Sequence, residues 1–159
     1  MKPVRTWGAE AARGDAAGVR VALAASRFHE PMVARLVEGA TEELARLGAR
    51  TEDVDLAWAP GAFELPHLAQ ALARSGRYDA ILALGVVIRG ETPHFDYVCA
   101  EAARGVADVS RTEGVPVLFG VVTANDPGQA HARAGGVSNK GTDVARAAIE
   151  FVRVLKEAR

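Results

Sequence analysis

His94 stands at the junction between an apolar segment and a helix-like segment, within the stretch LGVVIRGETPHFDYV (84–98). Residues 80–84 are all apolar and predict a buried strand before this junction. Thr92 and Pro93 suit the cap and the first position of a following helix. A strand that ends at a helix N-terminus leaves unpaired N–H groups beside the positive end of the helix dipole, which favours anion binding. An imidazole beside an anion site suggests acid–base chemistry on a charged small molecule. The same sequence is equally compatible with an ordinary strand–helix turn that carries a surface histidine.

Two other short segments combine residues that could line a small-molecule site. Phe28 follows an apolar run, so its ring would either stack on an aromatic ligand or pack beneath the helix that comes next. Gly61 would let the backbone come close to a ligand, and Glu64 would place a carboxylate nearby. That carboxylate suits hydrogen bonds from sugar-like hydroxyls, but it would equally favour the first turn of a helix.

The other reactive side chains are ambiguous when they are taken singly. Arg133 and Lys140 accompany a glycine-rich loop, and either could meet a phosphate or remain a solvated surface charge. Arg89 is expected to form a structural ion pair, and Cys99 is expected to be a small buried residue on the apolar face of its helix. The remaining histidines lack the spacing of metal ligands, and the last two are expected on exposed helix faces: His29, His67 and His131.

Length and composition limit the classes of function. The 159 residues suffice for one domain, which we place at 19–159 after an N-terminal arm at 1–18. A net charge of −1 gives no reason to expect nucleic acid or an anionic membrane as a partner. The single cysteine excludes an intramolecular disulfide or a cysteine-based metal cluster. It fits a reducing cytoplasm, and we expect a cytoplasmic protein because no signal peptide or membrane-spanning run is recognisable.

Apolar runs alternate with segments of helical periodicity along the whole domain. Strands are predicted at 19–25, 53–58, 79–88 and 116–122, with helices between them, a short helix at 128–134 and a last helix at about 143–156. This alternation predicts a parallel sheet with helices on both faces, an α/β fold whose ligands bind beyond the carboxyl ends of the strands. Unusual residues cluster where these strands end and are expected to form a site at one rim of the sheet. They are at 27–29, 60–64, 89–94 and 123–126.

The N-terminal arm carries one large aromatic residue. Residues 4–7 are predicted to form a short strand that includes Trp7. The indole needs a place to be buried, either on its own domain or against another subunit.

Several long motifs in the same order resemble those of the 6,7-dimethyl-8-ribityllumazine synthase family. They are SRF at 26–28, APGAFELP at 59–66, the stretch 84–98, FGV at 119–121, and ARAG at 132–135 with NKG at 139–141. The resemblance implies a three-layer, flavodoxin-like four-stranded parallel sheet. It also implies condensation of 5-amino-6-(D-ribitylamino)uracil with 3,4-dihydroxy-2-butanone 4-phosphate, the penultimate step of riboflavin biosynthesis, with no cofactor and no metal.

The resemblance also implies roles for individual residues. His94 would transfer protons, Phe28 would stack on the pyrimidine, and Glu91 and Thr92 would hold the phosphate through their N–H groups, with Arg133 supplying charge. Phe119 and the loop of Arg133 would come from a neighbouring subunit, because the family's sites lie between subunits. The residues implied to line the ring and ribityl pocket or to bind the uracil edge are Ala62, Phe63, Glu64, Val86, Val87 and Ile88.

The same resemblance implies a homo-oligomer, either a pentamer, a decamer or a 60-subunit icosahedral shell, with riboflavin synthase as a further partner. The N-terminal arm would add a strand to a neighbouring subunit's sheet. The chain departs from the family's pattern at His29, where Asn is common, and at Ala132, where Glu is frequent. Its glycine loop is also one residue shorter and lacks a common Lys, which leans the assembly toward the shell.

Two other functions use the same kind of fold. A non-catalytic protein that binds riboflavin-like ligands would share the stacking pocket, but it would need neither His94 nor Arg133. A flavodoxin-like electron carrier would need a hydroxyl- and glycine-rich phosphate loop after the first strand, and SRFHEP at 26–31 is not such a loop.

Overall fold

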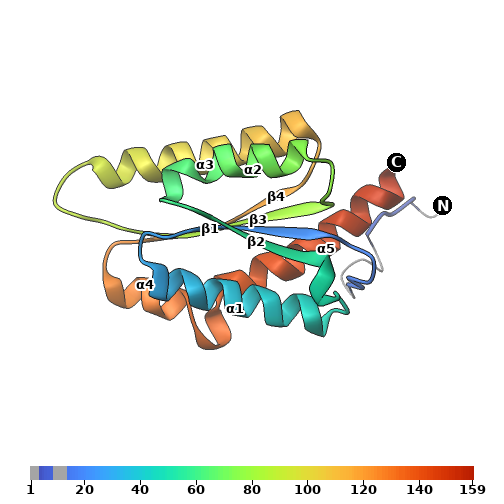
Figure 1. Cartoon of the computed structure of the whole chain (residues 1–159), viewed down its shortest axis with the longest axis horizontal. Coiled ribbons are helices and arrows are strands. Elements are labelled where there is room, and N and C mark those ends of the chain that lie inside the picture. Colours follow the sequence, from blue (N-terminus) through green and yellow to red (C-terminus); the bar gives the residue numbers. More distant parts are fainter. Residues whose placement is uncertain (1–3, 9–13) are drawn as a thin grey trace.

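The computed structural model describes residues 4–8 and 14–159, and the strands in it form one parallel sheet (Figure 1). The strand order is β2-β1-β3-β4, and each pair of neighbours is parallel. The strands are β1 (Val21–Ser26), β2 (Val54–Ala59), β3 (Ala80–Ile88) and β4 (Val117–Ala124). The α-helices are α1 (Glu30–Arg46), α2 (Leu65–Arg74), α3 (His94–Glu113), α4 (Pro127–Arg133) and α5 (Lys140–Ala158). The predicted four-stranded α/β fold is confirmed.

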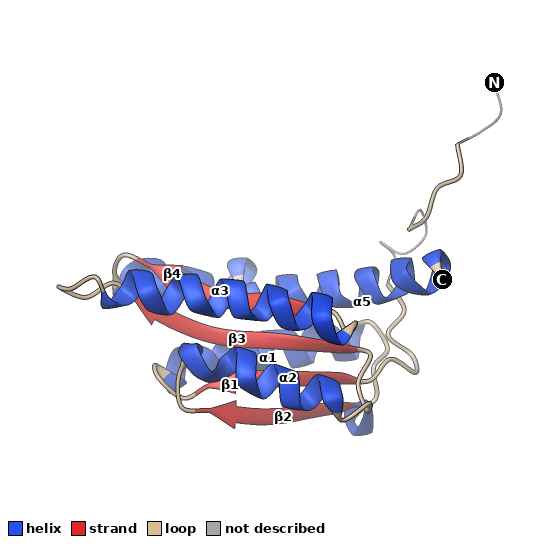
Figure 2. Cartoon of the chain, turned by 90° about the horizontal axis from the view of Figure 1, so that it is seen from above, coloured by secondary structure: helices blue, strands red, loops and turns tan. Residues whose placement is uncertain are grey.

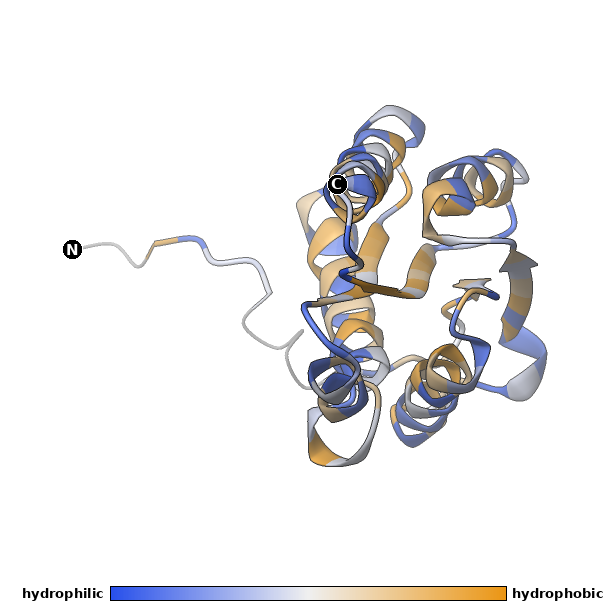
Figure 3. Ribbon diagram, turned by 90° about the vertical axis from the view of Figure 1, so that its left-hand side faces the viewer, coloured by the Kyte–Doolittle hydropathy of each residue, from blue (hydrophilic) through white to orange (hydrophobic). Residues whose placement is uncertain are grey.

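Helices cover both faces of the sheet, so the molecule has three layers. Helices α2 and α3 lie on one face, and α1, α4 and α5 lie on the other (Figures 1 and 2). Leu23 and Leu82 point into the core on the α1 and α5 side, and Ile81 points into the core beneath α2 and α3. Because the central strands β1 and β3 are buried on both faces, their sequences are continuous apolar runs. In Figure 3 the strands are mostly hydrophobic, while the helices show one hydrophobic and one hydrophilic side.

Two helix starts differ clearly from the prediction, those of α3 and α5. Helix α5 begins at Lys140, about three residues before the predicted start at 143, and the Asn139 side chain caps it. Gly48, at φ +100°, follows the end of α1, as expected of a glycine that stops a helix. Helix α3 begins one residue later than predicted, with Pro93 as its N-cap and His94 as its first residue, so Thr92 is not the cap. Its first turn closes when the N–H of Asp96 donates to the carbonyl of Pro93 at 2.9 Å. Pro93 has no N–H to leave unpaired, and its φ of −64° is compatible with the start of a helix.

The prediction of a strand at residues 4–7 is wrong for the single chain. These residues form no ladder with β1–β4, and a strand requires a hydrogen-bonding partner. The Trp7 ring stays 47% exposed beneath the guanidinium of Arg5, so it is not buried on its own domain. The last part of the predicted arm, residues 14–18, packs on the domain, because Ala16 is fully buried and its N–H donates to the carbonyl of Leu47 at 2.9 Å. The rest of the arm, at residues 1–3 and 9–13, lies outside the described residues.

A buried carboxylate joins the two long helices on one face of the sheet. Glu43 of α1 is 5% exposed, and its carboxylate accepts hydrogen bonds from Arg46 at 2.8 and 2.7 Å and from Arg146 of α5 at 3.0 Å. The bonds from Arg46, and then those from Arg146, lower the pKa of Glu43 below its ordinary 4.5 although burial opposes them. Ionised Glu43 therefore stabilises the fold.

Glu43→Gln is expected to lower the free energy of unfolding at pH 7 by about 1–2 kcal/mol, a modest loss because both guanidinium groups are half exposed. The folded-state pKa is lowered, so the stabilisation is complete above pH 4.5 and is lost as the pH falls through the folded-state value. Urea unfolding of both proteins between pH 7 and pH 3 measures this. The exposed Glu42→Gln serves as control, and a difference independent of pH would contradict the assignment.

Candidate active site

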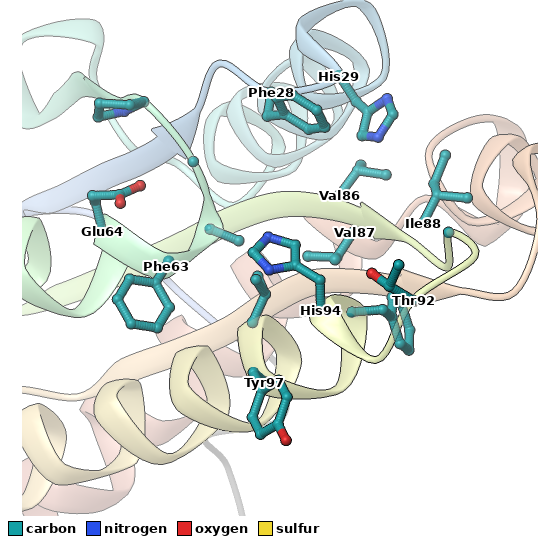
Figure 4. Close-up of a pocket in the computed structure, with 16 residues that line it drawn as sticks. Phe28, His29, Phe63, Glu64, Val86, Val87, Ile88, Thr92, His94 and Tyr97 are labelled. Atoms are coloured by element: carbon teal, nitrogen blue, oxygen red, sulfur yellow. The ribbon is translucent and has the colours of Figure 1, made fainter.

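The carboxyl ends of β1, β2 and β3 and the start of α3 enclose a cavity of about 610 Å³ (Figure 4). It lies at the rim of the sheet where the candidate residues were expected to meet. The residues that line it are Phe28, His29, Pro60, Gly61, Ala62, Phe63, Glu64, Val86, Val87, Ile88, Gly90, Thr92, His94, Phe95, Tyr97 and Val98. Most of the site residues that were predicted from separate segments of the sequence therefore line a single cavity.

Phe28 presents an uncovered aromatic ring to this cavity. Its side chain is 68% exposed, so it does not pack beneath its own helix. The ring meets the His29 imidazole edge to face, with centroids 4.8 Å apart and an interplanar angle of 76°. The N–H groups of Arg27 and Phe28 donate to the carbonyls of Ala59 and Pro60 at 2.9 and 3.1 Å, which fixes the β1 turn against the β2 turn. The free face of Phe28 is therefore available to stack on a flat ligand.

The bend after β2 brings a carboxylate to the same cavity. Residues Ala62–Glu64 form a single 3₁₀ turn, and the N–H of Glu64 donates to the carbonyl of Gly61 at 3.3 Å. A β-carbon at position 61 would lie 3.1 Å from Oε2 of Glu64, so glycine leaves room for the carboxylate to fold back over the bend. Ala62 is buried and Phe63 is exposed, which gives this wall an apolar surface with one acid at its edge.

His94 is the first residue of α3 and is exposed. In Figure 4 its imidazole points toward the region between the Glu64 bend and the end of β3. The residues before it lie in an exposed turn whose backbone leaves β3 beside β4, where the N–H of Arg89 donates to the carbonyl of Ala124 at 2.9 Å. A titratable ring thus stands in a largely apolar cavity next to an exposed loop backbone, an arrangement suited to proton transfer on a bound ligand.

Arg89 secures the turn and does not line the cavity. Its guanidinium lies 3.3 Å from the Asp96 carboxylate, donates to Oδ1 of Asn125 at 3.1 Å, and covers the Phe95 ring at 4.4 Å. The predicted structural ion pair is confirmed. The part of the chain that the structure describes contributes no Lys or Arg to the wall of this cavity.

Three residues implied to act at the site do not line this cavity within one chain. Arg133, at the end of α4, lines a separate hollow of about 330 Å³ together with Lys140, and its guanidinium donates to the carbonyl of Gln129 at 3.1 Å. Phe119, on the edge strand β4, is half-buried against the core beneath α2 and α3. Glu91 is exposed between Gly90 and Thr92, which do line the cavity.

The structure adds residues that the sequence did not single out. Tyr97, 70% exposed, and Val98 line the cavity because they follow His94 by three and four positions on α3 and so share its face. That helical spacing was a usable signal. In Figure 4 the hydroxyl of Tyr97 is directed away from His94.

Cys99 is half-buried rather than fully buried, and burial raises the pKa of its thiol. His67 and His131 are exposed on their helices, as predicted.

His29 has an unusual backbone for a residue with a side chain. It is the one non-glycine residue with positive φ in the described ranges, at φ 60° and ψ 40°, and its imidazole forms no capping bond to α1. Asparagine tolerates this left-handed region better than most residues. His29→Asn is therefore expected to raise the free energy of unfolding by about 0.5–1 kcal/mol, measured by urea unfolding. His67→Asn, on an exposed helix face, is the control and should not stabilise the protein. An equal increase in the free energy of unfolding in both variants would show that the backbone of His29 is not strained.

Within the described residues, no group of three or more His, Cys, Asp or Glu side chains is placed to hold a metal ion. None of the described helices has the length and hydropathy needed to cross a membrane. The cavity itself offers an aromatic ring, a carboxylate and an imidazole to a ligand, from Phe28, Glu64 and His94.

Comparison with known proteins gives one family. A family model described as 6,7-dimethyl-8-ribityllumazine synthase matches residues 18–156. A protein of that name from Desulfatibacillum aliphaticivorans is 49% identical over 144 residues, which cover 90% of this chain and 93% of the relative. Another of that name, from Nitratidesulfovibrio vulgaris, is 51% identical over 144 residues, covering 90% of this chain and 92% of the relative. The chain belongs to the 6,7-dimethyl-8-ribityllumazine synthase family.

Proposed function

We propose that the cavity binds 5-amino-6-(D-ribitylamino)uracil and 3,4-dihydroxy-2-butanone 4-phosphate and that the chain condenses them to the lumazine, releasing phosphate and water. Family membership gives the reaction class, a transferase acting in riboflavin biosynthesis. The observation that carries the assignment to this cavity is the meeting of Phe28, Glu64 and His94 around one space.

The pyrimidine half of the site uses the ends of β1, β2 and β3. The exposed face of Phe28 stacks on the uracil ring, and backbone groups of Val86, Val87 and Ile88 bind its edge. Ala62 and Phe63 cover the ribityl chain, while the Glu64 carboxylate accepts hydrogen bonds from its hydroxyls. This division follows from the apolar wall with its single acid.

The phosphate half combines the loop before α3 with a cation from a second protomer. The N–H groups of Glu91 and Thr92 hold the phosphate, and Arg133 of the neighbouring copy supplies charge, with Phe119 beside it. Two facts support this arrangement: the lining of the cavity contains no Lys or Arg among the described residues, and Arg133 lies in a separate hollow of its own chain. A phosphate dianion needs a charged partner, and an Arg provides paired donors.

The reaction needs several proton transfers and good positioning. The amine attacks the ketone, and loss of water from the adduct leaves a Schiff base. The carbon that bears the hydroxyl then loses a proton as phosphate departs from the adjacent carbon with its electron pair, and the resulting enol tautomerises to a ketone. The second amine attacks this ketone, and loss of a second water completes the ring. His94 accepts and returns the protons of these steps, the N–H groups and Arg133 stabilise the departing phosphate, and binding two reactants together supplies much of the rest.

The proposal includes assembly into a pentamer or a shell of pentamers in the cytoplasm. Strand β2 is an edge strand with Leu56 exposed, so residues 4–7 in the N-terminal arm of a neighbouring subunit are placed by this proposal as an added strand along β2, which would bury Trp7. Analytical ultracentrifugation separates a pentamer, a decamer and a 60-subunit shell. Co-purification tests whether riboflavin synthase is enclosed.

The test of activity is to mix the purified chain with both substrates and follow lumazine absorbance and fluorescence together with released phosphate. Equal amounts of lumazine and phosphate, formed faster than without protein, are expected. Incubation with each substrate alone is the control. Tight binding of the lumazine product with no catalysed formation would replace this proposal with the non-catalytic binder.

A further inference from the structure

Asn139 is a buried amide at the meeting point of three helices. It is 7% exposed, and its Nδ2 donates to the carbonyl of Arg35 in α1 at 2.8 Å and to the carbonyl of Ala134, after α4, at 3.4 Å. Its Oδ1 accepts from the N–H groups of Gly141 and Thr142 at 2.8 and 3.3 Å, which caps α5. Both N–H donors and the acceptor of this amide are therefore in use.

The packing around this amide leaves little room for movement. A β-carbon at Gly141 would lie 1.9 Å from the carbonyl oxygen of Leu36, so α5 meets the backbone of α1 directly. A β-carbon at Gly39 would lie 2.5 Å from the Asn139 amide. The hydroxyl of Thr142 adds a bond to the carbonyl of Gly39 at 3.3 Å. The start of α5 is thus fixed against α1, and Asn139 joins the end of α4 to the same point.

Two positively charged residues are sequence neighbours of the residues that this hydrogen bond joins, Ala134 and Asn139. Arg133 directly precedes Ala134, and Lys140 directly follows Asn139. Both line the hollow of about 330 Å³ beside the carboxyl end of β4, together with Thr123 and one carboxylate, that of Asp143, so the two cations outnumber the acid there. The separation of these two cations therefore depends on the bonds of the Asn139 amide. An Asp or Ser would still cap α5 through an oxygen, but neither could donate to both carbonyls as the amide does.

We propose that Asn139 is a positioning residue, which holds Arg133 and Lys140 at the spacing that receives the phosphate of the ketone substrate. This inference rests on the proposed function and extends it, because Asn139 acts through its neighbours and touches no substrate. A displacement of a binding group by about 1 Å can lower the reaction rate as much as 100-fold. Because Asn139 acts only through the two cations, its loss should affect the phosphorylated ketone and not the aminouracil.

The test compares Asn139→Asp and Asn139→Ser with the control Thr142→Ala, which loosens the same junction without touching the link to Ala134. Circular dichroism and melting temperature verify folding, and two variants are used so that one folded protein is available. Steady-state rates are measured against each substrate, and inorganic phosphate is tested as an inhibitor.

In the Asn139 variants, KM for the ketone phosphate and the inhibition constant of phosphate are expected to rise about tenfold. KM for the aminouracil should stay within about twofold, and Thr142→Ala should change neither by more than that. Unchanged ketone-phosphate KM in a folded Asn139 variant, or an equal rise for both substrates, would overturn the inference while an active wild type upholds the proposed function. An inactive wild type would overturn both.

Discussion

His94→Ala is expected to lower kcat by about 100-fold or less while both KM values change little, because proton transfer by one side chain contributes in that range. The loss is bounded because, under the proposed function, the variant's cavity would still hold the two reactants together and stabilise the departing phosphate. The His94 side chain is exposed at the edge of the cavity and is not packed in the core. Its removal should therefore leave Phe28 and Glu64 in place. Initial rates at saturating concentrations of both substrates measure the effect.

His67→Ala is the matched control, because His67 is exposed on α2 and does not line the cavity. It should retain the wild-type rate. Measuring both variants across pH 6 to 9 adds a second criterion, since loss of a proton-transfer group should change the shape of the rate profile and not only its height. A His94→Ala enzyme with the wild-type kcat would remove His94 from the mechanism.

Arg133→Ala is expected to raise KM for the ketone phosphate by about 10- to 100-fold, since a charge-assisted hydrogen bond contributes about 1.5–3 kcal/mol. KM for the aminouracil should be unchanged, because the proposed pyrimidine half of the site is built from the ends of β1, β2 and β3 and does not include Arg133. Arg133→Lys should give an intermediate value, since an ammonium keeps the charge but loses the paired donors.

Arg104→Ala is the control for a general loss of positive charge, because Arg104 lies on the exposed face of α3, paired with Glu101 and Asp108. Steady-state kinetics with each substrate varied in turn distinguish the two halves of the site. An unchanged ketone-phosphate half-saturation in Arg133→Ala would reject the phosphate role.

Local patterns in the sequence were enough to predict the fold and most of the residues that line the cavity. The apolar runs of β1 and β3 predict strands buried on both faces, and the parallel order then places the ends of these strands at one rim. The bend at Gly61 and the corner at His94 follow from this placement. Helix α3 starts one residue later than predicted, and its N-cap Pro93 makes no side-chain capping bond, so the capping preferences of Thr and Pro did not fix this boundary.

Features that depend on distant contacts could not be derived from local patterns. The exposure of Phe28 depends on the turn after β2, and the network of Asn139 joins residues that are far apart in the chain. Residues 4–7 have no backbone partner among the described residues, so their sequence alone did not make them a strand. The separation of Arg133 from the cavity likewise appears only when the elements are placed in three dimensions.

The central claim, that each site joins one protomer's His94 to another protomer's Arg133, is tested most directly by mixing the two impaired variants. His94→Ala and Arg133→Ala chains are denatured, combined in equal amounts, refolded into mixed oligomers and assayed at a ketone-phosphate concentration near the wild-type KM. Random mixing would give about one quarter of the sites both intact residues, so about one quarter of the wild-type activity is predicted. Activity no higher than the average of the two variants, from verified mixed oligomers, would place both residues in one chain and contradict the account.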